Sequence, residues 1–161
     1  MYLDSTHPAE TAVHDVRPVP GICSLSITAP AHAVSVGTLR SRASALFAGW
    51  AMSDDEQSTA ALVISELLTN AVIHGHDQMT LQVALTTSEL EIMVTDHGRP
   101  KNSAPPGDPE EHGRGLSLVA ALTHDLRIDQ MATGWRTRAR IDLATAPPAT
   151  ASARPTQGSM T

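Results

Sequence analysis

Three polar residues recur at four-residue intervals in the segment ELLTNAVIHGH, at Glu66, Asn70 and His74. Positions i, i+4 and i+8 lie along one side of an α-helix, so these side chains are predicted to form a polar row beside an apolar face. A carboxylate in such a row can take a proton from a hydroxyl group or water, and an amide oxygen can bind Mg²⁺ beside phosphate oxygens. The spacing is also compatible with a solvated helix face that has no chemical role.

A second candidate is the segment TDHGRP, in which Asp96 closes an alternating apolar stretch and Gly98 follows two residues later. A carboxylate at the end of a strand can accept a hydrogen bond from the exocyclic amine of a ligand. Gly98 would let a flat ring approach the backbone, because glycine has no Cβ. The alternative is an ordinary turn, since Asp and Gly favour turns for local reasons.

A third candidate is the segment HGRGLSLVAAL, where Gly113 and Gly115 flank Arg114. Exposed amides at the start of a helix bind anions, and we expect a helix to begin directly after these glycines. Arg114 adds a planar charged donor for phosphate. The alternative is a glycine-rich helix entry without a ligand. Lys101 is the only lysine and there is no Gly-x-x-x-x-Gly-Lys loop, which excludes P-loop enzymes and ordinary protein kinases.

These residues must be positioned by helices and strands, which the hydrophobic pattern predicts. Ser53 and Glu56 form a capping box that begins the central helix, and Gly75 follows its end. In the preceding helix, the candidate core positions are Val34, Leu39, Ala43, Leu46 and Phe47. The predicted helices are 31–50, 54–74 and 115–122; the predicted strands are 22–27, 79–85, 90–95, 126–129 and 136–143, with a loop over 97–112.

This order of elements predicts an α+β two-layer sandwich, with helices packed on one face of a mixed, mainly antiparallel sheet. The chain of 161 residues is long enough for one domain with a real core. We expect the folded domain to span 21–143. Residues 1–20 and 144–161 are predicted to be disordered tails, because they are polar or rich in Pro, Ala, Thr and Ser.

Composition excludes several classes of function. The net charge of −6, without a basic block, argues against nucleic acid as a partner. No segment approaches the ~20 apolar residues that span a bilayer, and the first ten residues do not have the pattern of a signal peptide, so we expect a cytoplasmic protein. Cys23 is the only cysteine, so an internal disulfide and a cysteine-based zinc site are excluded.

The segments ELLTNAVIHG, DHG and GRGLSLV, in this order, resemble the motifs of the GHKL-type (Bergerat) ATPase fold. More narrowly, they resemble the anti-sigma factor serine/threonine kinases and their stand-alone ATP-binding relatives. The resemblance covers residues 31–143. Two departures are that Arg99 and Pro100 replace a second glycine after Gly98, and that the stretch from Gly134 to Thr137 is longer than the usual Gly-x-Thr.

The resemblance implies ATP and Mg²⁺ as cofactors, with Glu66 as the general base and Asn70 as the Mg²⁺ ligand. Asp96 would accept the adenine amino group, Thr137 would support Asp96, and Arg114 would face the γ-phosphate as a second catalytic residue. The implied ATP-binding residues are Asn70, Asp96, Gly98, Gly113, Arg114, Gly115, Leu116 and Thr137.

The implied activity is a protein serine/threonine kinase that transfers the γ-phosphate of ATP to a STAS-type anti-sigma factor antagonist. It would also bind a sigma factor, control transcription and form a homodimer. One alternative is a non-catalytic ATP-binding regulator that acts by protein–protein contact. Another is a metal protein using His74, His76, Asp77 and His112. A two-component histidine kinase would need a dimerising helical hairpin, for which the first fifty residues leave no room.

Overall fold

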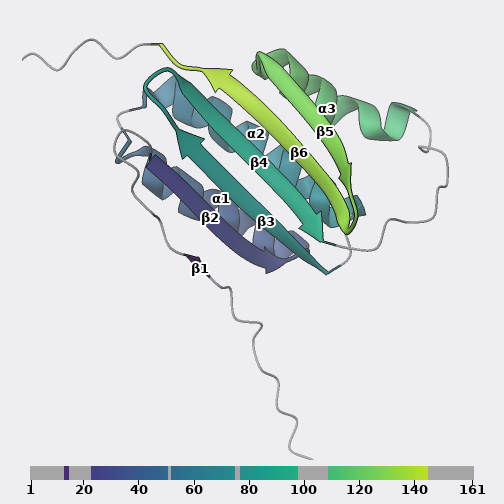
Figure 1. Ribbon diagram of the computed structural model, residues 1–161. Coiled ribbons are helices and arrows are strands. Elements are labelled where there is room, and N and C mark those ends of the chain that lie inside the picture. Colours follow the sequence, from purple (N-terminus) through teal and green to yellow (C-terminus); the bar gives the residue numbers. More distant parts are fainter. Residues whose placement is uncertain (1–12, 15–22, 51, 75–76, 98–108, 145–161) are drawn as a thin grey trace, which may run out of the picture.

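The computed structural model describes residues 13–14, 23–50, 52–74, 77–97 and 109–144. Within these residues three helices cover one face of a six-stranded sheet (Figure 1). The elements are β1 (Val13–His14), β2 (Cys23–Pro30), α1 (Ala33–Phe47), α2 (Asp54–His74), β3 (Gln78–Leu85), β4 (Glu89–His97), α3 (Pro109–Leu122), β5 (Asp125–Met131) and β6 (Gly134–Asp142).

The strands follow the order β1-β2-β3-β4-β6-β5, and every neighbouring pair is antiparallel. The predicted α+β sandwich is therefore confirmed, although we expected a mixed, mainly antiparallel sheet rather than one with antiparallel pairs throughout the described residues. Because β6 lies between β4 and β5, those two strands run in the same direction. A crossover through α3 connects them, as parallel strands require. Because β4 and β6 are antiparallel neighbours, the end of β4 lies beside the start of β6.

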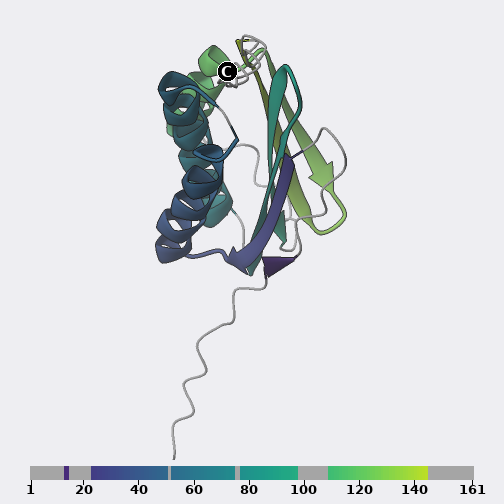
Figure 2. The same ribbon diagram turned by 90° about the vertical axis from the view of Figure 1, so that its left-hand side faces the viewer.

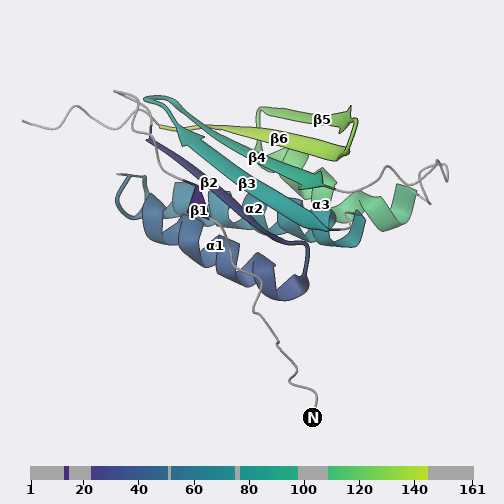
Figure 3. The same cartoon turned by 60° about the horizontal axis from the view of Figure 1, so that its bottom comes forward.

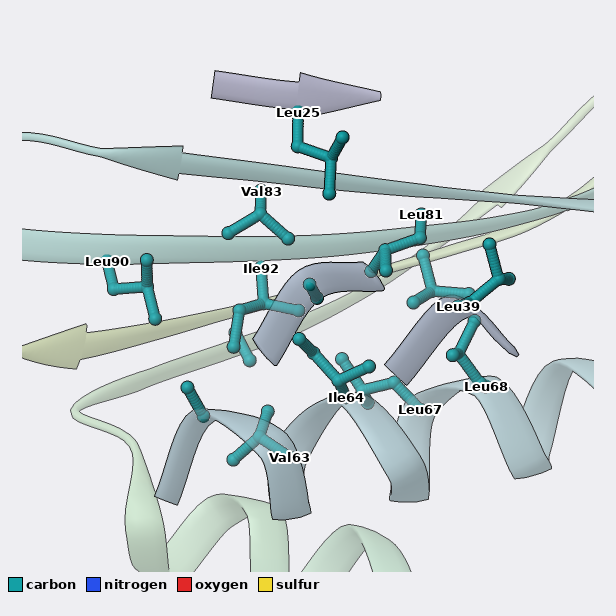
Figure 4. Packing of buried hydrophobic residues seen from close by; sticks show 14 of the residues in the cluster. Leu25, Leu39, Val63, Ile64, Leu67, Leu68, Leu81, Val83, Leu90 and Ile92 are labelled. Carbon is teal, nitrogen blue, oxygen red and sulfur yellow. The ribbon is translucent and has the colours of Figure 1, made fainter. Parts of the chain in front are cut away.

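The core lies between the sheet and the helices. In two further views the helices are on one side of the sheet (Figures 2 and 3). Alternate residues of β3 and β4 are buried, since successive side chains of a strand point to opposite faces. The helix α2 packs its apolar face on them (Figure 4). The buried residues of these three elements include Val63, Ile64, Leu67, Leu68, Ala71, Met79, Leu81, Val83, Leu90, Ile92 and Val94.

The capping box at the start of α2 forms as predicted. The Glu56 amide donates to Ser53 Oγ at 3.3 Å, and the Ser53 amide donates to Glu56 Oε2 at 2.7 Å. The Ala144 amide also donates to Glu56 Oε1 at 2.9 Å. The backbone hydrogen bond from Ser53 lowers the pKa of Glu56 below its ordinary value of 4.5. These contacts fix one end of the helix that carries Glu66 and Asn70.

Two predictions in the first third of the chain are wrong. Val34 is 83% exposed rather than buried. The buried face of α1 is set by Leu39, Ala43 and Phe47, and Val34 lies five residues before Leu39, about 140° around the helix. In addition, Val13 and His14 pair with β2 as the strand β1, within the segment that we expected to be a disordered tail. The other tail residues lie outside the described ones.

Helix α3 begins earlier than predicted, at Pro109 rather than Gly115. A proline is well suited to the first turn of a helix, where its missing N–H needs no partner. Gly113 and Gly115 therefore lie inside the helix, so their amides are not at its start and that premise of the predicted anion site is wrong. The predicted loop is also shorter at its beginning, because His97 belongs to β4.

Candidate functional site

Glu66 lies against helix α3. A Cβ atom built on Gly115 would be 2.5 Å from Glu66 Oε2, closer than real Cβ contacts come. Gly115 is thus the residue that lets α3 approach the carboxylate, and the structure brings together two residues predicted for the same site. Arg114, the neighbour of Gly115, is exposed and makes no ion pair within the described part of the chain.

Asn70 is one turn after Glu66 on α2 and is half-buried. Its Nδ2 atom is buried and has no hydrogen-bond partner among the described residues. A buried polar atom without a partner costs about 1–3 kcal/mol, so natural proteins rarely keep one without a reason. A half-turn of the amide exchanges its nitrogen and oxygen, so this side chain can present either a donor or an acceptor to a ligand.

Asp96 is a charged residue inside the described fold, with only 7% of its surface exposed. Its Oδ1 atom accepts a hydrogen bond from the Trp135 amide at 2.8 Å. The other carboxylate oxygen makes no hydrogen bond within the described part of the chain. Since a poorly hydrated carboxylate is costly unless it is paired, the second oxygen is suited to a donor from a ligand.

The turn before β6 is shaped around Asp96. Gly134 has a φ of 133°, a conformation that residues with a side chain rarely adopt, and a Cβ there would overlap the Asp96 carbonyl and Oδ1 atoms. The resemblance implies Thr137 as the support of Asp96. Thr137 pairs with Val94, two residues before Asp96, and makes no hydrogen bond to Asp96 within the described residues. The observed support is a backbone amide, and the sequence feature that marks it is the glycine with which β6 begins.

The remaining predicted residues have different positions. Gly98 lies outside the described residues. Leu116 is partly buried and packs on the hydrophobic core, which gives it a structural role. Of the alternative metal ligands, His74 is the last residue of α2 and Asp77 precedes β3, whereas His76 and the side chain of His112 lie outside the described residues.

A different group of possible metal ligands occurs where β4 begins. His124 Nε2 lies 3.4 Å from Glu89 Oε2, and its Nδ1 lies 3.2 Å from Asp142 Oδ1. Arg140 Nε lies 3.6 Å from Glu89 Oε1, so the guanidinium supplies the positive charge that a metal ion would otherwise provide to this carboxylate. We interpret this group as an ion-pair network. It is far from Asp96, which is near the other end of β4.

A shallow hollow on the open face of the sheet, lined by residues that include Ser24, Gln82 and Met93, is also separate from the site. These side chains alternate with the buried ones, so they point away from the helices. Glu66, Asn70 and Asp96 instead belong to the helix-covered side. None of the helices in the described part of the chain is long and apolar enough to cross a bilayer.

Comparison with solved structures finds the RsbU and RsbW domains of Rv1364c from Mycobacterium tuberculosis, at a TM-score of 0.60 and 23% sequence identity. The match covers 78% of this chain but 33% of the other, so this chain spans about a third of the length of the solved chain and shares the fold of the matched part. No curated protein matches the sequence. A family model described as a histidine kinase-like ATPase domain matches residues 29–141, which confirms the resemblance to the GHKL-type fold. The chain belongs to the histidine kinase-like ATPase domain family.

Proposed function

We propose that this protein binds ATP with Mg²⁺ and is a serine/threonine protein kinase of the GHKL type. Its substrate would be a STAS-type anti-sigma factor antagonist, and it would also bind a sigma factor and form a homodimer. The observation that carries the kinase proposal is the Glu66 carboxylate, which lies against Gly115 of α3. A solvated helix face would not need a glycine on the neighbouring helix at that point.

Asp96 would recognise the adenine base. Its Oδ1 atom is held by the Trp135 amide, which leaves the other oxygen to accept a hydrogen bond from the exocyclic amine. Guanine has a carbonyl oxygen at the corresponding position, and two acceptors facing each other repel. A carboxylate there therefore favours ATP over GTP.

The donor set around Asn70 fits Mg²⁺ in a nucleotide site. Mg²⁺ binds proteins through one or two oxygen ligands and takes the rest of its shell from phosphates and water. The Asn70 amide supplies one such oxygen when it is turned, and its amide nitrogen now has no partner within the described residues. When bound, Mg²⁺ would neutralise charge on the phosphate oxygens.

In the transfer step, Glu66 would take the proton from the serine or threonine hydroxyl of the substrate. The hydroxyl oxygen would form a bond to the γ-phosphorus, while the bond from that phosphorus to the β–γ bridging oxygen breaks and ADP leaves. Arg114 would stabilise the negative charge on the γ-phosphoryl oxygens, because its guanidinium is a planar multiple donor. It is available for this role since it has no ion pair in the described structure.

The partners are proposed from the resemblance and from the fold shared with a structure that contains an RsbW domain. Binding to a sigma factor would place the protein in the cytoplasm. A second candidate function is a non-catalytic ATP-binding regulator that acts by protein–protein contact. It would use Asp96 and Asn70 in the same way but would not need Glu66 as a base.

The experiment is a transfer assay with γ-labelled ATP and an extract of the source cells. We expect wild-type protein to label a substrate on serine or threonine, with a label that is stable to acid, and Glu66→Gln to lose it. Asp55→Asn, an exposed acid on the same helix, is the matched control and should transfer normally. If ATP binds by calorimetry but Glu66→Gln transfers as fast as wild type, the kinase mechanism is refuted. An acid-labile label would instead indicate phosphohistidine.

A further inference from the structure

Trp135 is connected to the proposed adenine site through its backbone. Its amide donates to Asp96 Oδ1 at 2.8 Å, and the preceding Gly134 is in a conformation that closes the turn onto Asp96. The strand register pairs Thr95 with Arg136. Continued by one pair, it sets Trp135 opposite Asp96 at the end of the ladder.

The indole of Trp135 lies on the same side of the sheet as the carboxylate. Side chains alternate along a strand, and Ala139 and Ile141 of β6 are buried beneath the helices. Trp135 has the same parity as these two residues, so its side chain projects from the helix-covered face. Directly opposed residues of antiparallel strands have Cβ atoms about 4.5–5.5 Å apart, so the Trp135 side chain starts beside that of Asp96.

The apolar surface at this point is nevertheless uncovered within the described structure. Trp135 is 39% exposed and Ile128 is 47% exposed. Ile128 pairs with Thr137, so it is a diagonal neighbour of Trp135 on the same face. Single exposed apolar residues are ordinary in proteins. Here, however, Trp135 lies next to a buried carboxylate whose second oxygen has no hydrogen bond among the described residues, and Ile128 extends the apolar surface on the far side of Trp135.

A flat aromatic ring that carries an exocyclic amine matches both features. Its edge can donate to a carboxylate while its face packs on an apolar or aromatic surface. We infer that the indole of Trp135 is a wall of the nucleotide site and packs against the purine base, which makes Trp135 a base-binding residue. This inference rests on the proposed binding of ATP. In it, Asp96 selects which base is bound, and Trp135 supplies affinity for any aromatic base.

The affinity for ATP then has one part from the base, which packs on Trp135, and another part from the phosphates. Base–aromatic stacking contributes about 1–3 kcal/mol per base by alanine substitution, which corresponds to roughly a 5- to 150-fold change in affinity. Trp135→Ala keeps the backbone amide that holds Asp96, so the substitution removes the indole alone. We expect it to weaken ATP binding about tenfold or more and to leave the affinity for inorganic tripolyphosphate, which has no base, unchanged.

Fluorescence provides a readout of contact, because Trp50 and Trp135 are the only two tryptophans. Trp50 packs on Phe47 with ring centroids 5.7 Å apart, and its replacement in Trp50→Phe leaves Trp135 as the single reporter. ATP should change the emission of this variant with the same Kd that calorimetry gives. In a wild-type background, Trp135→Phe should bind ATP nearly normally, because a second aromatic ring replaces the indole, but should lose the emission change.

Two outcomes are distinguishable. If calorimetry shows ATP binding but the Trp135 emission does not respond and Trp135→Ala binds ATP as tightly as wild type, the inference about Trp135 is overturned and ATP binding stands. If calorimetry shows no ATP binding to the wild-type protein, the proposed function fails and the inference fails with it.

Discussion

Replacing Gly115 by alanine should damage the site without damaging the fold. The added Cβ would lie 2.5 Å from Glu66 Oε2, whereas ordinary contacts begin at 3.4 Å, so the carboxylate has to retreat by about 0.9 Å. It can do so, because it is the end of a flexible side chain. A misplacement of about 1 Å in a catalytic group can lower a rate on the order of 100-fold. We therefore expect the phosphotransfer rate of Gly115→Ala to fall roughly 10- to 100-fold.

The stability of Gly115→Ala should rise or stay the same while its transfer rate falls. Alanine is about 0.8–1.0 kcal/mol more favourable than glycine inside a helix, and Gly115 lies inside α3. The free energy of unfolding of Gly115→Ala, measured by urea denaturation, should equal or exceed that of wild type. A loss of rate with a stable fold would then be a local effect on Glu66.

Gly37→Ala is the matched control. Gly37 is inside α1, and a Cβ there would meet no atom within 4 Å, so the same substitution should raise stability by up to about 1 kcal/mol and leave the transfer rate unchanged. The assay is the single-turnover transfer of label from γ-labelled ATP, run with calorimetry of ATP binding. A full transfer rate in Gly115→Ala would refute the assignment of Glu66 as the base at this position.

Four further predictions concern single residues. The pKa of Glu56 is lowered from 4.5, so the ionised carboxylate stabilises the fold above about pH 4.5, and this contribution is lost as the pH falls through the lower pKa of the folded state. Glu56→Gln should therefore reduce the fall of the urea midpoint at acid pH, and an unchanged fall would contradict this prediction. Gly134→Ala should lower the free energy of unfolding by at least about 1–3 kcal/mol in urea denaturation, because of its φ of 133° and the overlap with Asp96; wild-type stability would show that the turn is not constrained. In calorimetry, Mg²⁺ should raise the ATP affinity of Asn70→Ala about tenfold less than it raises that of wild type. An equal effect of Mg²⁺ on both proteins would show that Asn70 is not the ligand. Asp96→Asn should lose the preference for ATP over GTP in competition binding, since an amide can also donate to the guanine oxygen, and unchanged discrimination would refute the adenine assignment.

The central helix was predictable because its signals are local. A capping box fixes the start of α2, and its apolar face repeats with the period of the helix, so the predicted bounds of 54–74 agree with the structure. The strands β3 and β4 were predictable for the same reason, through strict alternation. The sequence predicts only the second half of helix α3, because the glycines and the proline of its first turns are typical of loops, although proline is favourable at that position.

The support of Asp96 could not be read from the sequence. The place of Asp96 at the end of a strand makes it a candidate, but Asp96 is held by the amide of Trp135, and every residue except proline has such an amide. Only the strand pairing decides which amide faces the carboxylate. The closeness of Glu66 and Gly115 is similar, because it depends on how α3 crosses back over the sheet between β4 and β5.

The most direct test of the account is a titration of ¹⁵N-labelled protein with Mg²⁺ and a non-hydrolysable ATP analogue, followed by NMR. We predict that the Trp135 and Gly115 amides and the Asn70 side-chain amide shift together with one Kd. Gln82 and Met93, which line the hollow on the open face of the sheet, should not move. Shifts at Gln82 and Met93 with none at Trp135, Gly115 and Asn70 would place the nucleotide on the other face and contradict the account.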